Sequence, residues 1–313
     1  YQKQGSGYGY SGVRGLNALL ATATTQTAAP VILGQRLRRG AVGSPRGAGR
    51  MVGDVLATLK RLRPGSDTRV LVRADAAFYG HPTVAATLAA GADVCLTARM
   101  DKAVKAAIAT IDVTAWTGIE YPEAIYDETT GTWTSKAEVA EVPFTAFTSK
   151  KKAQRIPGRL VVRRIPELNP QDTNQPMLFG THRFHAFFTT VDPEVLDTVT
   201  ADRTHRGHAL IEQVNADLKD SALAHLPSGH FGANSAWLVC AVMAYNLTRT
   251  AGTLAAGEFT RARTGTIRAR LVNLPARIAS SARRIRMRLP ETWPWQQGFE
   301  RLFTAVHPPP QPA

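Results

Sequence analysis

The sequence predicts an α/β fold in which a β-rich segment interrupts an alternating pattern of strands and helices. Three observations lead to this fold class. Residues 69–110 alternate short apolar strands with helical stretches, residues 113–191 are rich in Thr, Trp and Phe with repeated turn signals, and helical periodicity resumes from residue 193. The chain has 313 residues, of which 44% are hydrophobic, so it can bury the core of one elaborated domain or of two smaller ones.

The first part of the chain supplies the alternating pattern. Residues 69–74 form a strand that is apolar enough to lie in the centre of a sheet, and a helix opens at Pro82 and ends before Gly91. A second apolar strand follows at residues 93–98, which predicts a parallel pair of strands joined by that helix. The other elements expected here are strands at residues 16–23 and 31–37 and helices at residues 47–62 and 102–110.

The second part of the chain begins with the β-rich segment and continues with helices. Hydrophobic runs predict strands at residues 160–165 and 184–191. The longest apolar helical stretch, residues 233–254, is expected to be buried. Residues 284–289 alternate Arg with apolar side chains, which predicts a strand with one basic and one apolar face. Two further helices are expected at residues 193–199 and 203–219.

The net charge of +14 is distributed unevenly along the chain. No Asp or Glu precedes Asp54, and a second acid-free span covers residues 259–290. Because Lys and Arg displace counterions from phosphates, this excess favours a nucleic acid partner. The alternative is a soluble protein from an organism with an Arg-rich proteome. A solvated surface explains one acid-free basic run easily, but two such runs favour a phosphate-binding path. The cations of the two spans are Lys3, Arg14, Arg36, Arg38, Arg39, Arg46 and Arg50, then Arg261, Arg263, Arg268, Arg270, Arg277, Arg283, Arg284, Arg286 and Arg288.

Cysteine usage and hydropathy exclude several classes of protein. Cys95 and Cys240 lie inside apolar runs, so both are expected to be buried and reduced and not part of a disulfide framework. The most apolar helical stretch, residues 236–247, is too short to span a bilayer, and we expect no secretory signal because no positively charged start is followed by an apolar stretch. We therefore expect a cytoplasmic protein without a membrane partner.

The predicted helix at residues 203–219 carries the richest set of reactive side chains. Apolar residues at helical spacing are expected to pack on the core, and the neighbouring side offers a carboxylate, two imidazoles and an ammonium. The alternative is an amphipathic helix with a solvated polar face. A zinc site is disfavoured because the spacing differs from the His-Glu-x-x-His motif of zinc peptidases. The apolar stripe is Ile211, Val214 and Leu218, and the polar stripe is His205, His208, Glu212, Asn215 and Lys219.

Asp75 follows directly after the apolar strand that ends at residue 74. A helix N-cap is the ordinary role for such an acid, but the next predicted helix begins near Pro82, too far along the chain for Asp75 to cap it. An acid at the carboxyl end of a strand in an open α/β sheet fits a functional site better. One carboxylate holds a magnesium ion poorly, and Glu212 is the natural second ligand for two-ion phosphoryl transfer.

Several stretches together resemble the DDE transposases of bacterial insertion sequences, and in particular the insertion-sequence 1380 family. Asp75 and Glu212 occur in the expected order with a β-rich stretch between them, and the resemblance covers nearly the whole chain. The matching stretches are YQKQGSGYGYSGVRGLNALLAT (1–22), VLVRADAAFYG (70–80), HRGHALIEQVNADLKDSALAHLPSG (205–229), ANSAWLVCAVMAYNLTR (233–249) and the basic PARIASSARRIRMRLPETWPW (275–295).

The resemblance implies an RNase H-like core with three metal-binding acids and a β-rich insertion between the second and third. Asp75 matches the second acid and Glu212 the third, and both are expected to be catalytic ligands of two Mg²⁺ ions, with Mn²⁺ as a substitute. The implied domains are a first part of the core at residues 1–112, expected to lack its first strand, and the β-rich insertion at 113–191. A second part of the core with the catalytic Glu helix follows at 192–255, and then a basic C-terminal segment with a disordered tail at 256–313.

The resemblance also implies double-stranded DNA as the partner, both the terminal inverted repeats and the target, bound by a homo-oligomer in the bacterial cytoplasm at the nucleoid. The wider superfamily has Tyr and Arg where this chain has His205 and His208. In the β-rich segment, Trp116 and Trp133 are expected to pack in the core more readily than to stack on an extruded base. The residues expected to contact DNA are Lys219, His208, His205, Arg206, Arg284, Arg286 and Arg288.

The first acid of the family has no counterpart in this chain, because no carboxylate precedes Asp54. We expect the sequence to be a truncated transposase that lacks the first catalytic Asp and is by itself a weak or inactive nuclease. One alternative is a non-catalytic, DNA-binding remnant of a transposase. Another is a general RNase H-like nuclease that does not transpose DNA.

Overall fold

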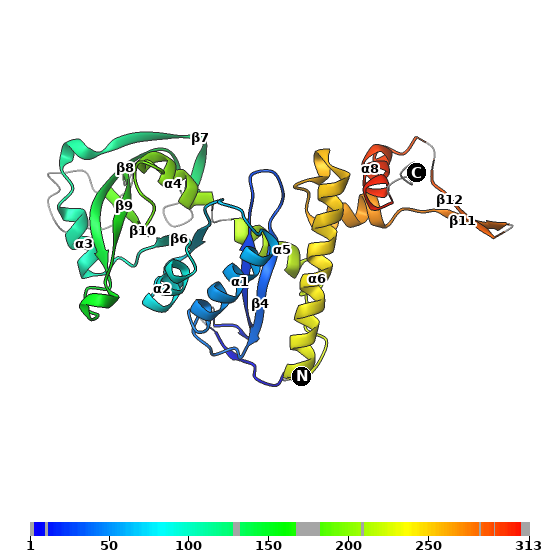
Figure 1. The fold of residues 1–313 in the computed structure, drawn as a ribbon, viewed down its shortest axis with the longest axis horizontal. Helices are drawn as coiled ribbons and strands as arrows, with labels where there is room; N and C mark the ends of the chain where they lie inside the picture. Colours follow the sequence, from blue (N-terminus) through cyan, green and yellow to red (C-terminus); the bar gives the residue numbers. More distant parts are fainter. Residues whose placement is uncertain are drawn as a thin grey trace. The chain divides into compact units, whose positions relative to one another are not determined.

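The structure is a computed structural model that describes residues 3–9, 12–127, 132–166, 182–207, 210–281, 283–290 and 292–307. The chain divides into two compact units (Figure 1). We call residues Ser44–His208 the sheet unit, and residues Tyr1–Gly43 with Ala209–Ala313 the helical unit. These divisions differ from the four predicted segments, whose assignment as functional domains stays a prediction.

The sheet unit is built on one six-stranded mixed sheet with the order β5-β6-β10-β9-β8-β7. Strands β5 and β6 are parallel, as predicted, with Val72 paired to Val94, and every other neighbouring pair is antiparallel. The strands of the β-rich segment therefore continue the same sheet that contains the parallel pair. The bounds are β5 Leu71–Ala74, β6 Asp93–Thr97, β7 Thr117–Asp127, β8 Thr132–Ala146, β9 Ile156–Pro166 and β10 His182–Thr189.

Strand β5 lies at the end of this sheet, so the prediction of a central strand at residues 69–74 is wrong. All four residues of β5 are only partly buried, whereas Val94, Cys95 and Leu96 of β6 are fully buried. A short apolar run occurs in an end strand and in a central strand alike, because hydrophobicity reports burial and not the number of paired neighbours.

Helices cover the sheet and complete its core. Val84 of α2 packs with Val94, Leu96 and Phe188 of the strands, and Val104 of α3 packs with Leu160. Two acids outside these clusters cap the N-termini of helices. The Asp101 side chain accepts a hydrogen bond from the Val104 amide in the first turn of α3, and the Asp197 side chain accepts one from a backbone amide in the first turn of α4. The helices are α1 Ala48–Leu62, α2 His81–Ala89, α3 Lys102–Ala109 and α4 Thr198–Arg206, with 3₁₀ helices at Ala76–Phe78, Val113–Ala115 and Lys152–Gln154.

The helical unit begins with an antiparallel hairpin and continues with helices from the C-terminal half. Ile32 and Leu37 of the hairpin, Val214 and Leu218 of α5, and Leu238 of α6 share one core. The elements are β1 Gly7–Tyr8, β2 Arg14–Gly15, the hairpin β3 Asn17–Ala23 and β4 Val31–Arg38, α5 Leu210–Lys219, α6 Phe231–Ala255, the 3₁₀ helix Gly257–Phe259, α7 Thr264–Ile267, the π-helix Arg268–Val272, the ribbon β11 Arg277–Ser281 and β12 Arg284–Arg288, and α8 Gln296–Val306.

Helix α6 is buried on one side only, so the expectation that its whole apolar stretch is buried is wrong. Leu238 and Val242 face the core, while Met243 is 58% exposed and Leu247 is 68% exposed. Cys240 lies on the exposed side, which corrects the expectation that both cysteines are buried. Uniform hydrophobicity along a helix hides which side packs, because the period that would mark one face is lost.

Candidate active site

Asp75 occupies the turn that follows the carboxyl end of β5. Its Oδ1 accepts a hydrogen bond of 2.9 Å from the amide of Ala77, and the side chain opens the 3₁₀ helix Ala76–Phe78. Asp75 is therefore an N-cap after all, of a short helix that the sequence did not reveal. The residue is exposed, so its carboxylate is open to a ligand from solvent.

The turn that carries Asp75 is fixed from several sides. Arg99 donates through Nε to the carbonyl of Ala76 at 3.2 Å. Behind the turn, Tyr79 packs on Phe147 and Phe188, and burial raises the pKa of its hydroxyl above the ordinary range. These contacts hold a backbone that presents one carboxylate at the end of a strand.

Arg73, two residues before Asp75, joins β5 to the end of α4. Its Nη1 donates to the carbonyl of Thr204 at 2.7 Å, where a cation complements the negative end of the helix. Burial lowers the pKa of Arg73 from its ordinary value. A Cβ added at Gly207, the C-cap of α4, would lie 2.7 Å from the same Nη1 atom.

His205 lies inside the sheet unit, so the geometry gives it a different environment from the polar stripe that was predicted. The residue is 8% exposed, and its ring stacks on Phe187 at 4.2 Å between centroids. Nδ1 lies 3.3 Å from the sulfur of Cys95, and Nε2 lies 3.1 Å from Oγ1 of Thr97. With both nitrogens engaged within the protein, we expect a structural role for His205 instead of the predicted DNA contact.

Arg206 is likewise tied to the sheet unit. Its Nε donates to Asp202 at 2.9 Å, and Asp202 is 1% exposed and also pairs with Arg163 at 3.4 Å. The side chain of Arg206 keeps 27% of its surface exposed. Contact with DNA therefore stays a prediction for this residue, whose charge already compensates a buried carboxylate.

The structure divides the predicted helix at residues 203–219 into two helices. Helix α4 ends at Arg206 and α5 begins at Leu210, so the continuous polar stripe from His205 to Lys219 is wrong. His208, a predicted DNA contact, lies outside the described residues. The apolar half of the pattern is confirmed within α5, where Val214 and Leu218 are buried and Ile211 packs against them.

Glu212 and Lys219 lie on the exposed side of α5. Glu212 is in the first turn, where the positive end of the helix dipole favours a carboxylate, and Lys219 is in the last turn, where a cation is favoured. Asn215 between them is also exposed. The helix thus presents an acid, an amide and an ammonium to solvent at the predicted helical spacing.

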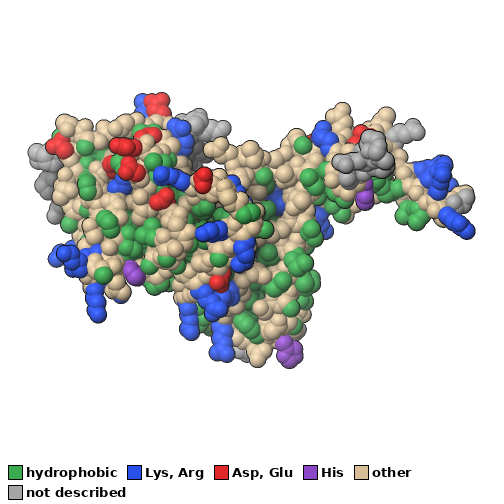
Figure 2. All heavy atoms as spheres, viewed as in Figure 1, with side chains coloured by type: hydrophobic (Ala, Val, Ile, Leu, Met, Phe, Trp, Pro, Cys, Tyr) green, Lys and Arg blue, Asp and Glu red, His purple; other side chains and the backbone are tan. Residues whose placement is uncertain are grey.

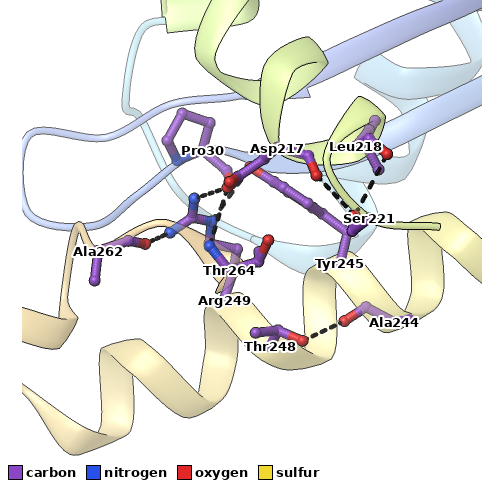
Figure 3. Close-up of polar contacts among 10 residues, drawn as sticks. All are labelled: Pro30, Asp217, Leu218, Ser221, Ala244, Tyr245, Thr248, Arg249, Ala262 and Thr264. Carbon is purple, nitrogen blue, oxygen red and sulfur yellow. Dashed lines mark hydrogen bonds and ion pairs between the residues drawn. The ribbon is translucent and has the colours of Figure 1, made fainter. Parts of the chain in front are cut away.

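A buried ion pair fixes α5 to the rest of the helical unit (Figure 3). Asp217 Oδ2 accepts from Nη2 of Arg249 at 2.5 Å and from the amide of Thr264 at 3.2 Å. The guanidinium of Arg249 also donates to the carbonyl of Ala262 and, through Nε at 3.3 Å, to the hydroxyl of Tyr245. The helix that carries Glu212 and Lys219 is therefore joined to α6 and to the start of α7.

One feature of the sequence indicates this buried ion pair. Arg249 is the single charged residue in the apolar stretch 233–254, and a lone cation in an apolar helix usually has a buried partner. The partner, Asp217, lies five residues beyond Glu212 on a different side of the helix.

The predicted ligands fall in different units: Asp75 belongs to the sheet unit and Glu212 to the helical unit. Over the described ranges, no group of three or more His, Cys, Asp or Glu side chains is assembled as a metal site. Trp116 of the sheet unit packs beside Phe184 and against the guanidinium of Arg164. This agrees with the prediction that Trp116 packs in the core. The side chain of Trp133 lies outside the described residues.

The predicted basic strand is confirmed as β12, and it pairs with β11 to form a two-stranded ribbon. Arg284, Arg286 and Arg288 of β12 are all exposed. Figure 2 shows Lys and Arg side chains gathered at the ribbon, which Figure 1 labels β11 and β12. The ribbon is therefore the second candidate site in the chain, and its chemistry suits a polyanion.

The family described as Transposase DDE domain group 1 matches residues 25–311, which is most of the chain. A comparison with curated proteins found no match. The helices in the described ranges include none with the length and apolar character that crossing a membrane requires.

Proposed function

Because the chain belongs to the Transposase DDE domain group 1 family, we propose that it is a DNA transposase of an insertion sequence, of the insertion-sequence 1380 type. The proposed reaction cuts the ends of the element and joins them to target DNA by phosphoryl transfer. The observation that carries the proposal is the family match over residues 25–311, to which the placement of Asp75 after β5 and of Glu212 on the exposed side of α5 adds chemical support.

In this proposal Asp75 and Glu212 are the second and third acids of an RNase H-like core. Lys219, on the same side of α5 as Glu212, would contact a DNA phosphate near the cut strand. The first acid has no residue assigned to it, because no carboxylate occurs before Asp54.

The two carboxylates are of the ligand type that divalent metal ions prefer. Mg²⁺ and Mn²⁺ prefer oxygen ligands, and Asp75 and Glu212 are both exposed carboxylates. Bound ions would activate the attacking oxygen and stabilise the leaving oxygen. Two carboxylates are few for two ions, so we expect the chain to cleave DNA weakly. The protein's own contribution is to hold Asp75 rigidly through its turn and Glu212 rigidly through the anchored helix α5.

A non-catalytic, DNA-binding remnant is the second candidate function. It is favoured by the absence of Asp and Glu from residues 1–53, which leaves the first acid of the family unassigned. A remnant would keep the basic surfaces and bind DNA, but it would not cut it.

The two candidates differ in a cleavage assay with purified protein. The substrate is a plasmid that carries the gene with its flanking DNA, incubated with Mg²⁺ or Mn²⁺. The transposase proposal expects slow strand cleavage that Asp75→Ala and Glu212→Ala abolish. Asp112→Ala is the matched control, because Asp112 is also an exposed N-cap of a 3₁₀ helix in the sheet unit. Tight DNA binding without any cleavage would favour the remnant.

A further inference from the structure

The ribbon of β11 and β12 has a strict division between its two faces. Cross-strand pairing sets Arg277 opposite Arg288, Ala279 opposite Arg286 and Ser281 opposite Arg284, so these residues share one face. We call this the arginine face. The other face carries three exposed apolar side chains: Ile278 at 73%, Ile285 at 78% and Met287 at 48%.

The arginine face has no counter-charge among the residues that the structure describes. None of its four guanidiniums forms an ion pair there, and residues 259–290 contain no acid at all. Arg277 and Arg288 are directly opposite each other, an arrangement of like charges that destabilises a free ribbon. A face of this kind gains most of its stability when a polyanion covers it.

The dimensions of the ribbon match one kind of polyanion. Each strand has five residues and is therefore about 17 Å long, and alternate arginines on one strand are about 7 Å apart. The major groove of B-form DNA is about 12 Å wide and admits a two-stranded ribbon, whereas the minor groove is about 6 Å wide. Nearly all residues of the ribbon are exposed, so the rest of the helical unit leaves it accessible.

We propose that the arginine face of the β11–β12 ribbon binds duplex DNA in the major groove, with Arg277, Arg284, Arg286 and Arg288 contacting the phosphates that border it. This inference rests on the proposed function for its choice of DNA as the polyanion. It adds Arg277 to the predicted DNA contacts and assigns the apolar face no part in binding.

The test is a salt titration of DNA binding, measured by fluorescence anisotropy on a short random-sequence duplex without divalent ions. Each phosphate contact contributes about 0.9 to the slope of log K against log salt. The variant Arg284→Gln/Arg286→Gln/Arg288→Gln should lower that slope by about 2.7, which corresponds to a loss of about 500-fold in affinity at about 0.1 M salt. Arg277→Gln alone should lower the slope by about 0.9.

Two control variants separate this effect from general loss of charge and from loss of the ribbon. Lys150→Gln/Lys151→Gln/Lys152→Gln removes the same charge from an exposed segment of the sheet unit, and it should leave the slope nearly unchanged. Ile278→Thr/Ile285→Thr changes the apolar face and should also leave the slope unchanged, because threonine is compatible with a strand.

The groove is tested with modified DNA. A duplex whose cytosines carry a glucosylated hydroxymethyl group fills the major groove, and it should bind the parent protein as weakly as the plain duplex binds the triple arginine variant. Netropsin, which occupies the minor groove, should not compete.

Three results would overturn the proposal. They are an unchanged salt slope in the triple arginine variant, competition by netropsin, and a loss of binding to anionic phospholipid vesicles without a loss of binding to DNA. Because these assays contain no divalent ion, their outcome is independent of cleavage. A protein that never cuts DNA but shows the predicted slopes would refute the proposed catalytic function and support the ribbon.

Discussion

Replacing Arg249 with Met should destabilise the helical unit, because the substitution leaves the Asp217 carboxylate buried without its counter-charge. The two side chains are 7% and 4% exposed, and their atoms approach to 2.5 Å. Among the described residues, the amide of Thr264 at 3.2 Å would be the remaining donor to that carboxylate oxygen. Met fills a similar volume, so the effect is chiefly electrostatic.

The expected magnitude follows from burial. Removing one partner of a buried ion pair costs about 3–5 kcal/mol, because a desolvated charge is left uncompensated. Typical domains are stable by about 5–15 kcal/mol, so this loss is a large fraction of the total. The double variant Asp217→Leu/Arg249→Met removes both charges, and we expect it to be at least about 1 kcal/mol more stable than Arg249→Met alone.

Urea denaturation followed by circular dichroism measures these free energies, and hydrogen exchange of the α5 and α6 amides locates the loss. Arg50→Met is the control, because Arg50 forms an exposed i,i+4 pair with Asp54 at 3.9 Å and should change stability by less than about 0.5 kcal/mol. A stability of Arg249→Met within about 1 kcal/mol of the parent would contradict this prediction, and so would a double variant that is less stable than both the parent and Arg249→Met.

Three further predictions concern the sheet unit and the cysteines. A thiol reagent should label Cys240 in the native protein and leave Cys95 unlabelled, because Cys95 is buried and burial raises its pKa to about 12; labelling of Cys95 before unfolding would contradict this. Gly158→Ala should lower the melting temperature, because the added Cβ would lie 2.5 Å from the carbonyl of Thr189 and 2.7 Å from the ring of Phe188; an unchanged melting temperature counts against the tight packing. The hydrogen bond from Arg164 lowers the pKa of Glu138, so this carboxylate stabilises the fold above its unfolded pKa of about 4.5 and the contribution is lost as pH falls through the folded value. Glu138→Gln should therefore reduce the loss of folding stability at acid pH by about 0.5 kcal/mol or less, since the Arg164–Glu138 pair is partly exposed. A stability–pH curve parallel to the parent's would contradict this role of Glu138.

Local patterns in the sequence predicted the elements whose evidence is itself local. The period of α5 placed Val214 and Leu218 in the core, and the alternation at residues 284–289 predicted a strand with a basic face. The parallel pairing of β5 with β6 followed from a strand, a helix and a second strand at short spacing. The evidence for each of these features lies within one helix, within one strand, or within two strands joined by one helix.

Local sequence patterns do not predict which distant strands pair or where a helix ends. Nothing in the period of the β-rich segment says that β10 pairs with β6, because partner choice depends on residues nearly a hundred positions apart. The stripe that joined His205 to Glu212 assumed one helix across Gly207, where α4 in fact ends. The capping role of Asp75 is not predictable from the sequence, because the three-residue 3₁₀ helix that it caps is too short to show a periodic pattern.

The proposed function requires Asp75 and Glu212 to bind the same metal ions, and Mn²⁺ binding tests this requirement most directly. Electron paramagnetic resonance of free Mn²⁺ gives the affinity of the parent, of Asp75→Asn, of Glu212→Gln and of the double variant, each in the presence of duplex DNA. The account predicts at least about a tenfold loss for either single variant and little further loss in the double variant, because the two ligands act on one site. Unchanged affinity in either single variant, or losses that simply add, would contradict it.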